Sequence, residues 1–270
     1  MITRQQVADT PSTGSAPATV DWSLGWRYEL VRSATGGEES VRLPLTIEEA
    51  RHPKEGYIMP ERTEHDSLSD DLCDMLRAHF ADQPEVAVFR NLVTHWDRPD
   101  VGDYAPDVAV VAPVRNRDEN RSQFIVADEG ARPLLTIEVV SRSTRRYDRV
   151  DKVRDYALVG VQEYVYIDVW ERRGQVQREI AGFRLENGRY LPILPDEDGA
   201  LFLNSVNLRI GLDDGRVWLE DAATGQELLT NLQAQSALRT TESALAAAEA
   251  RIAALEAELA MQRQQASRNQ

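Results

Sequence analysis

Two apolar runs decide how this chain folds, the first opened by an acid and the second carrying an acid near its end. The first is Pro106-Asp107-Val108-Ala109-Val110-Val111, and the second is Leu134-Leu135-Thr136-Ile137-Glu138-Val139-Val140. Runs of this length without polar alternation are typical of strands that are buried on both faces of a sheet. If the two strands are neighbours, the carboxylates of Asp107 and Glu138 meet at one end of that sheet.

A helix and a third buried strand follow the second run. Ser143 or Thr144 can cap the start of the helix, and Gly160 can end it. The strand covers Glu163 to Val169. A strand, a helix and a strand in this order imply a right-handed crossover between parallel strands. We therefore expect an α/β (α+β) fold with a mixed central sheet flanked by helices.

The other segments are arranged around this unit. Apolar residues three and four positions apart predict a long helix from about Thr63 to Ala81. After Trp170, glycines and prolines separate short alternating runs, which predicts hairpins that extend the sheet or cover its edge through residues 201–219. We expect a disordered tail at 1–20, one α/β domain at 21–222 and a C-terminal helix at 226–266.

The C-terminal helix carries a short heptad pattern. Leu238, Leu245, Ile252 and Leu259 fall seven residues apart, and Thr241, Ala248 and Leu255 follow the first three by three residues. Such a seam is typical of a coiled coil, although Thr241 and Ala248 weaken it. The helix can pair with a second copy of the chain or fold back onto the domain. We expect a homodimer through this coiled coil.

The charge of the chain is strongly acidic but unevenly spread. There are 31 basic and 45 acidic residues, giving a formal net charge of −14, which argues against binding nucleic acid over the whole surface. One stretch, residues 141–154, is instead rich in cations and follows Glu138 directly: Arg142, Arg145, Arg146, Arg149, Lys152 and Arg154. A phosphate-bearing substrate is expected there, with Arg142, Arg145 and Arg146 in contact. The alternative is a solvated helix face with ion pairs.

Several classes of site and location are disfavoured. Cys73 is the only cysteine, so neither an intrachain disulfide nor a cysteine zinc cluster can form. The four histidines show no zinc-ligand spacing. The N-terminus lacks a signal-peptide pattern, and no apolar run is long enough to span a bilayer. We expect a cytoplasmic protein that does not enter a membrane.

Asp107 and Glu138 suit a hard divalent cation. Two carboxylates ~4 Å apart repel each other by roughly 4 kcal/mol at an effective dielectric constant near 20. Such a pair needs a shared proton or a cation. Oxygen ligands with water in the remaining positions are preferred by Mg²⁺ or Mn²⁺, and the backbone carbonyl of Val139 can add a further oxygen.

Lys152 lies one helix after Glu138. An ammonium group beside the metal can help to deprotonate or orient a water, or offset charge on a phosphate in the transition state. The structural alternative is an ion pair with Asp148, four residues earlier on the helix. His65, in the first turn of the long helix, can face the same site, but charged groups near a helix start also occur without any function.

The motifs around these residues resemble a known family. They are Pro106-Asp107, the run Ile137-Glu138-Val139-Val140-Ser141-Arg142-Ser143-Thr144, and then Asp148, Lys152, Tyr156, Gly160-Val161, Glu163-Tyr164 and Asp168. In this order and spacing they resemble the Uma family of restriction-endonuclease-like proteins, a branch of the PD-(D/E)XK nuclease superfamily. The resemblance covers about Leu43 to Leu194.

This resemblance implies a restriction-endonuclease-like core and metal-dependent hydrolysis of phosphodiesters by in-line attack of a metal-bound water. Asp107 and Glu138 are carried over as catalytic metal ligands. Val140 stands where the superfamily pattern has its lysine, so Lys152 from the next helix would take that role. Ser141, Ser143 and Asp148, together with His65, would support the ligands from behind and orient Lys152.

Three functions are compatible with these residues. The first is a Mg²⁺- or Mn²⁺-dependent endonuclease whose partner is nucleic acid, DNA by preference. The second is a catalytically inactive nuclease fold that serves as an interaction or regulatory module and oligomerises through the C-terminal helix. The third is a hydrolase of small phosphate compounds. Magnesium binding that disappears when Asp107 or Glu138 is changed to Ala separates the first from the second.

Overall fold

The computed structural model describes residues 20–32, 37–59, 63–140, 144–213 and 216–268. The chain forms two compact units, Met1–Pro60 and Glu61–Gln270, which are treated separately below. The tail expected at 1–20 lies outside the described residues apart from Val20. The domain boundaries expected at residues 21, 222 and 226 remain predictions.

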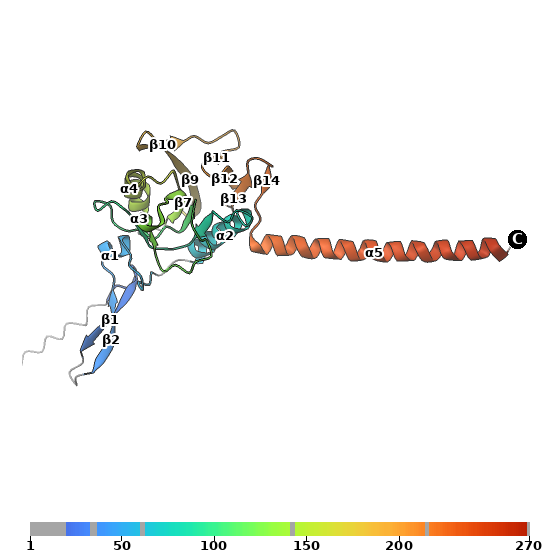
Figure 1. The fold of residues 1–270 in the computed structure, drawn as a ribbon, viewed down its shortest axis with the longest axis horizontal. Helices are drawn as coiled ribbons and strands as arrows, with labels where there is room; N and C mark the ends of the chain where they lie inside the picture. Colours follow the sequence, from blue (N-terminus) through green and yellow to red (C-terminus); the bar gives the residue numbers. More distant parts are fainter. Residues whose placement is uncertain (1–19, 33–36, 60–62, 141–143, 214–215, 269–270) are drawn as a thin grey trace, which may run out of the picture. The chain divides into compact units, whose positions relative to one another are not determined.

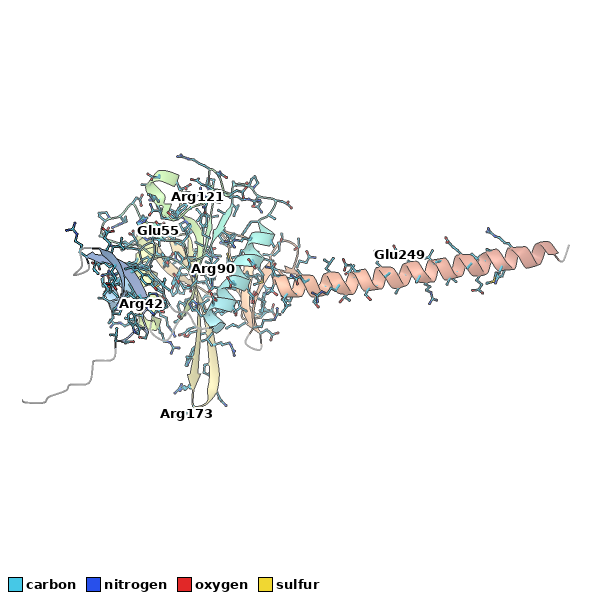
Figure 2. The ribbon with its side chains drawn as sticks, turned by 90° about the horizontal axis from the view of Figure 1, so that it is seen from below. Arg42, Glu55, Arg90, Arg121, Arg173 and Glu249 are labelled. Atoms are coloured by element: carbon cyan, nitrogen blue, oxygen red, sulfur yellow. The ribbon has the colours of Figure 1, made fainter. Side chains whose placement is uncertain are left out.

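The first unit is a hairpin followed by a short helix. Strands β1 (Trp26–Arg32) and β2 (Glu38–Pro44) pair antiparallel, and the guanidinium of Arg42 lies 3.9 Å from the ring centre of Trp26 (Figure 2). Helix α1 (Ile47–Arg51) begins with a capping box. The Glu49 amide donates to Thr46 Oγ1 at 3.2 Å, and the Thr46 amide donates to Glu49 Oε2 at 2.9 Å. This reciprocal cap satisfies two amides that the helix itself leaves without acceptors.

A six-stranded mixed sheet forms the centre of the second unit (Figure 1). Its strand order is β10-β9-β8-β7-β5-β3, and the pair β7–β8 is parallel while the other pairs are antiparallel. The bounds are β3 (Ala87–Phe89), β5 (Val108–Val111), β7 (Pro133–Val140), β8 (Glu163–Arg172), β9 (Gln175–Glu186) and β10 (Arg189–Ile193). The expected mixed sheet with a parallel crossover is confirmed.

One face of the sheet is covered by α2 (Thr63–His79) and by a second sheet. Leu72 and Leu76 of α2 are fully buried against Val108 and Ile137 of the central sheet. The second sheet comprises β11 (Leu201–Leu203), β12 (Leu208–Asp213), β13 (Arg216–Asp221) and β14 (Gln226–Glu227). These strands were expected to continue the hairpins at the sheet edge. They form a separate layer because their leucines and isoleucine face the same apolar core as α2.

The opposite face carries the helix that follows β7. It consists of η1 (Tyr147–Asp151), a π-helical turn, and α4 (Lys152–Val159), which ends at Gly160 in a left-handed conformation with φ of 82°. Four tyrosines fill the space beneath it, Tyr104, Tyr147, Tyr156 and Tyr164. Short elements complete this side of the unit: β4 (Thr94–His95), β6 (Phe124–Ile125) and α3 (Val126–Glu129). α2 and α4 therefore lie on opposite faces of the sheet (Figure 1).

The last element is α5 (Asn231–Arg268), a single helix that begins beside α2 (Figure 1). Asn231 Nδ2 donates to the Asp74 carboxylate of α2 at this junction. The long C-terminal helix expected from composition is confirmed. No helix in the described part of the chain is long and apolar enough to cross a bilayer.

Candidate active site

The strand register brings Asp107 and Glu138 together. Val108 of β5 lies opposite Ile137 of β7, so the next position along the antiparallel pair sets Asp107 against Glu138. Both carboxylates are buried, with 8% and 2% of each residue exposed. Asp107 Oδ2 accepts a hydrogen bond of 2.7 Å from the Val139 amide, which fixes it to β7. Asp107, which opens the first apolar run, and Glu138, near the end of the second, are therefore neighbours.

The Val139 backbone contacts Asp107 through its amide. In an antiparallel pair, the N–H and C=O groups of one residue point to the same side of the strand. Because the Val139 amide points at Asp107, its carbonyl is directed to the Asp107 side as well. Val139 is therefore a residue of β7 whose backbone faces Asp107.

His65 reaches the same carboxylate from the first turn of α2. Its Nε2 lies 3.2 Å from Asp107 Oδ2, and its side chain is largely buried. The first turn of α2 therefore places an imidazole beside the carboxylate that directly precedes β5. A donor here helps to hold the Asp107 carboxylate in one orientation.

Lys152 enters the site from the other face, at the first residue of α4. Its Nζ lies 2.8 Å from Glu138 Oε1 and 2.9 Å from Asp148 Oδ1. The ion pair with Asp148 that the structural alternative predicts is present, and a second ion pair joins Lys152 to Glu138. Burial by itself would lower the pKa of Lys152, but the carboxylates of Asp148, Glu138 and Asp107 outweigh burial and raise it. The ammonium is therefore charged at neutral pH.

The pKa of Glu138 is strongly shifted by its surroundings. Burial raises the pKa of Glu138 to about 7, an effect that Lys152 opposes and that Asp107 and Asp148 increase. Tyr156, one turn after Lys152 on α4, donates its hydroxyl to Glu138 Oε1 at 2.7 Å. Glu138 consequently sits between a cation and a phenol, and its charge depends on what else binds nearby.

The π-helical turn sets the position of Asp148. The Asp148 amide donates to the Thr144 carbonyl at 2.9 Å, and its own carbonyl accepts from the Tyr164 hydroxyl at 2.8 Å. A π-turn inserts an extra residue per turn and often occurs at functional sites. Here the turn is tied by its backbone to β8, and Asp148 is held against Lys152.

The arginines that were expected to contact the substrate, Arg142, Arg145 and Arg146, differ in their surroundings. Arg145 is bound to Asp168 of β8 with Nη2 2.8 Å from Oδ1, and Arg149 is bound to the other oxygen at 3.0 Å. Arg145 also lies over the Trp170 ring at 5.1 Å. Arg146 is exposed. Arg142 and its neighbours Ser141 and Ser143 lie outside the described residues. The cationic stretch thus contains ion pairs as well as an exposed arginine.

Two partners at the site had no role assigned from the sequence. Tyr156 lies four residues after Lys152, so a helix places both on one face, which is a usable signal. Asp168 stands in the apolar strand Tyr164–Val169 and is fully buried. A carboxylate inside such a strand needs a cation, and the arginines of the preceding helix are the nearest in sequence. Both signals can be read from the sequence, but they predict which side chains are in contact and do not predict a catalytic role.

The donor set fits a hard divalent cation. Among the described residues, no group of three or more His, Cys, Asp or Glu side chains is arranged to hold a metal ion. The available ligands are two carboxylates and one backbone carbonyl, with water for the remaining positions, which matches the preference of Mg²⁺. Three buried carboxylates, Asp107, Glu138 and Asp148, also face the single ammonium of Lys152. A divalent cation would balance the excess negative charge.

The central mixed sheet is flanked by helices, two acids lie side by side where neighbouring strands meet, and a lysine lies on the crossover helix. This arrangement is that of a restriction-endonuclease-like nuclease fold. Comparison with known families agrees, because the sequence model of the Uma2 family, described as "Putative restriction endonuclease", matches residues 51–213. The chain belongs to this family. Nucleases of this class generally use divalent metal ions.

One solved structure to which this chain is similar is described as "a putative nuclease belonging to DUF820" from Anabaena variabilis ATCC 29413. It is 15% identical to this chain, and the alignment covers 55% of this chain and 76% of that one with a TM-score of 0.40. A search of curated proteins gave no match.

Proposed function

We propose that this protein is a divalent-metal-dependent endonuclease that hydrolyses phosphodiester bonds of DNA. The observation that carries the proposal is the meeting of Asp107, Glu138 and Lys152 at one end of the sheet. Asp107, Glu138 and the Val139 carbonyl would hold Mg²⁺ or Mn²⁺. When bound there, the cation supplies Lewis-acid polarisation of the phosphate and a water of lowered pKa for in-line attack.

Lys152 acts electrostatically in this proposal. Because its ammonium stays protonated, it cannot accept a proton from water and is not a general base. A charged group in a buried site instead stabilises negative charge that develops on the phosphate oxygens. Asp148 holds the ammonium from one side, so that it points at the Glu138 end of the sheet.

Asp107 and Glu138 are positioned by neighbours that do not touch the substrate. His65 and the Val139 amide hold Asp107, and the Tyr156 hydroxyl holds Glu138. Fixing both carboxylates before a metal arrives lowers the cost of ordering them on binding. Arg146 supplies exposed positive charge for the DNA backbone, and the second copy of the chain joins through α5.

The test combines metal binding and cleavage. Calorimetric titration with Mg²⁺ and Mn²⁺ and cleavage of supercoiled plasmid would be followed in wild type, Asp107→Ala and Lys152→Ala. We expect metal binding to be lost in Asp107→Ala and cleavage to be lost in both variants. Asp82→Ala, which removes an exposed acid after α2, is the matched control and should behave as wild type.

Two outcomes would redirect the proposal. If the wild type binds metal but cleaves neither DNA nor RNA, the site acts on another phosphate compound. If the wild type binds no metal at millimolar concentration, the hydrolytic function fails and an interaction module with a nuclease fold takes its place.

A further inference from the structure

Helix α5 exposes a continuous apolar stripe. Leu238, Leu245, Ile252, Leu255 and Leu259 are each at least half exposed, with values between 50% and 60%. Figure 2 shows the side chains of α5, including the labelled Glu249, standing out from the ribbon. Large aliphatic side chains arranged along one face of a helix indicate a partner for that face.

The glutamates of α5 fix the heptad frame. With Leu238, Leu245, Ile252 and Leu259 at position a, position d holds Thr241, Ala248 and Leu255. The other frame, with the leucines at d, would place three glutamates in the seam, Glu242, Glu249 and Glu256. Burying carboxylates against each other is costly, so only the first frame gives an apolar interface.

In the first frame, the charges beside the seam match those of a parallel second copy. Position g of one helix faces position e five residues later on a parallel partner. Arg251 therefore faces Glu256 of the partner subunit, and Glu258 faces Arg263 of the partner subunit. The remaining pairs join Ala237 and Ala244 to glutamates. A parallel dimer contains no like-charged pair along this seam.

An antiparallel pair would be repelled. In that arrangement, position e faces position e, which brings Glu242 beside Glu256 and Glu249 beside its own copy. Within α5, Arg251, Glu256 and Glu258 have no charged residue three or four positions away. A parallel α5 of a second copy explains why these charged residues lie beside the seam.

We infer that α5 pairs in parallel with α5 of a second copy of this chain, and that Arg251 and Glu258 select this orientation. The inference does not depend on the nuclease function. Since α5 begins beside α2, a parallel pair places the two α/β cores at the same end of the coil.

The first test measures oligomeric state by sedimentation equilibrium of the full chain. Wild type should be a dimer, and Arg251→Glu should raise its dissociation constant about tenfold, because two symmetric pairs become repulsive. The double variant Arg251→Glu/Glu256→Arg should restore wild-type affinity. Arg239→Glu, at outward-facing position b, is the matched control and should have no effect.

The second test measures orientation by disulfide formation. A parallel pair sets Thr241 beside its own copy, so Thr241→Cys alone should cross-link under mild oxidation, while the buried Cys73 stays reduced. An antiparallel pair, in which position d faces position a, would instead cross-link Thr241→Cys with Leu259→Cys in a mixture of the two variants. A monomeric wild type, an Arg251→Glu variant that dimerises as wild type does, or cross-linking only in the mixture would each overturn the inference.

Discussion

At the scale of single residues, the positive charge of the site is the Lys152 ammonium, which is held between the carboxylates of Glu138 and Asp148. Only two of the 31 basic residues are lysines, Lys54 and Lys152, and the rest are arginines. A chain that otherwise uses arginine keeps lysine where the charge must fit between Glu138 and Asp148. The compact ammonium donates in three directions from one point, whereas the planar guanidinium requires a wider fork.

Lys152→Arg should therefore lower cleavage at least about tenfold while the positive charge remains. The larger group cannot contact Glu138 and Asp148 from the same point. Lys54→Arg changes the other lysine, which is exposed, and should leave the rate unchanged. The rate of plasmid nicking at saturating Mg²⁺ is the measurement, and equal rates for the two variants would remove Lys152 from the proposed chemistry.

The raised pKa of Glu138 makes a prediction about stability. A carboxyl whose pKa rises to about 7 on folding binds its proton more tightly in the folded state. Its favourable contribution is thus present below the unfolded pKa of 4.5 and is lost as pH rises through 7. With a chelator present, Glu138→Gln should raise the free energy of unfolding at pH 8 by on the order of 2 kcal/mol and should give no gain at pH 4.

Urea unfolding at the two pH values measures this difference. Glu197→Gln removes an exposed carboxylate and should show no such pH-dependent gain. A Glu138→Gln variant that is less stable than wild type at pH 8 without metal would mean that the Lys152 pair outweighs the cost of burying Glu138.

The same pKa predicts how metal affinity changes with pH. A metal ligand must be deprotonated, so the affinity should fall about tenfold for each pH unit below 7. Calorimetric titration with Mn²⁺ at pH 6 and pH 8 tests this. Equal affinities at both values would show that Glu138 is not a ligand.

At the scale of elements, the apolar runs of the sequence predicted β5, β7 and β8 because a doubly buried strand leaves no polar positions. The helix from 63 was equally clear from its apolar stripe. The separate layer β11–β14 was not predictable, since an alternating pattern marks a buried face without saying which layer it faces. The π-turn at Tyr147–Asp151 was also not predictable, because one extra residue in a turn leaves the apolar spacing almost unchanged.

For the site, the apolar runs and the family resemblance indicated Asp107, Glu138 and Lys152, with supporting residues that included His65 and Asp148, but not the contacts that hold them. The neighbours His65 and Tyr156 depend on the register between elements, which a sequence of buried strands does not specify on its own. The role of Arg145 also depends on tertiary contacts, because the helix start can reach either substrate or Asp168 and the structure shows the ion pair.

The pairing of Asp168 with Arg145 and Arg149 predicts a loss of stability on substitution. Asp168→Ala removes the carboxylate that Arg145 and Arg149 share, leaves Arg149 with Glu179 alone, and should cost about 3 kcal/mol of unfolding free energy. Urea unfolding measures it, with Asp128→Ala on α3 as an exposed control. A change below about 0.5 kcal/mol would show that the helix bearing Lys152 is held by the tyrosines instead.

At the scale of the whole molecule, the acidic net charge contrasts with membership of a nuclease family. The formal charge of −14 argues against nucleic-acid binding over the whole surface, yet family membership indicates a nuclease. The family match ends at residue 213, so α5 lies outside it. The catalytic proposal and the assembly proposal therefore concern different parts of the chain, and either can fail without the other.

The most direct test of the hydrolytic site is to locate the metal in a crystal grown with Mn²⁺. The anomalous difference map should contain one peak about 2.2 Å from Asp107, Glu138 and the Val139 carbonyl oxygen. A saturated crystal with no peak there, and with the Lys152 ammonium still 2.8 Å from Glu138, would contradict the metal-dependent site.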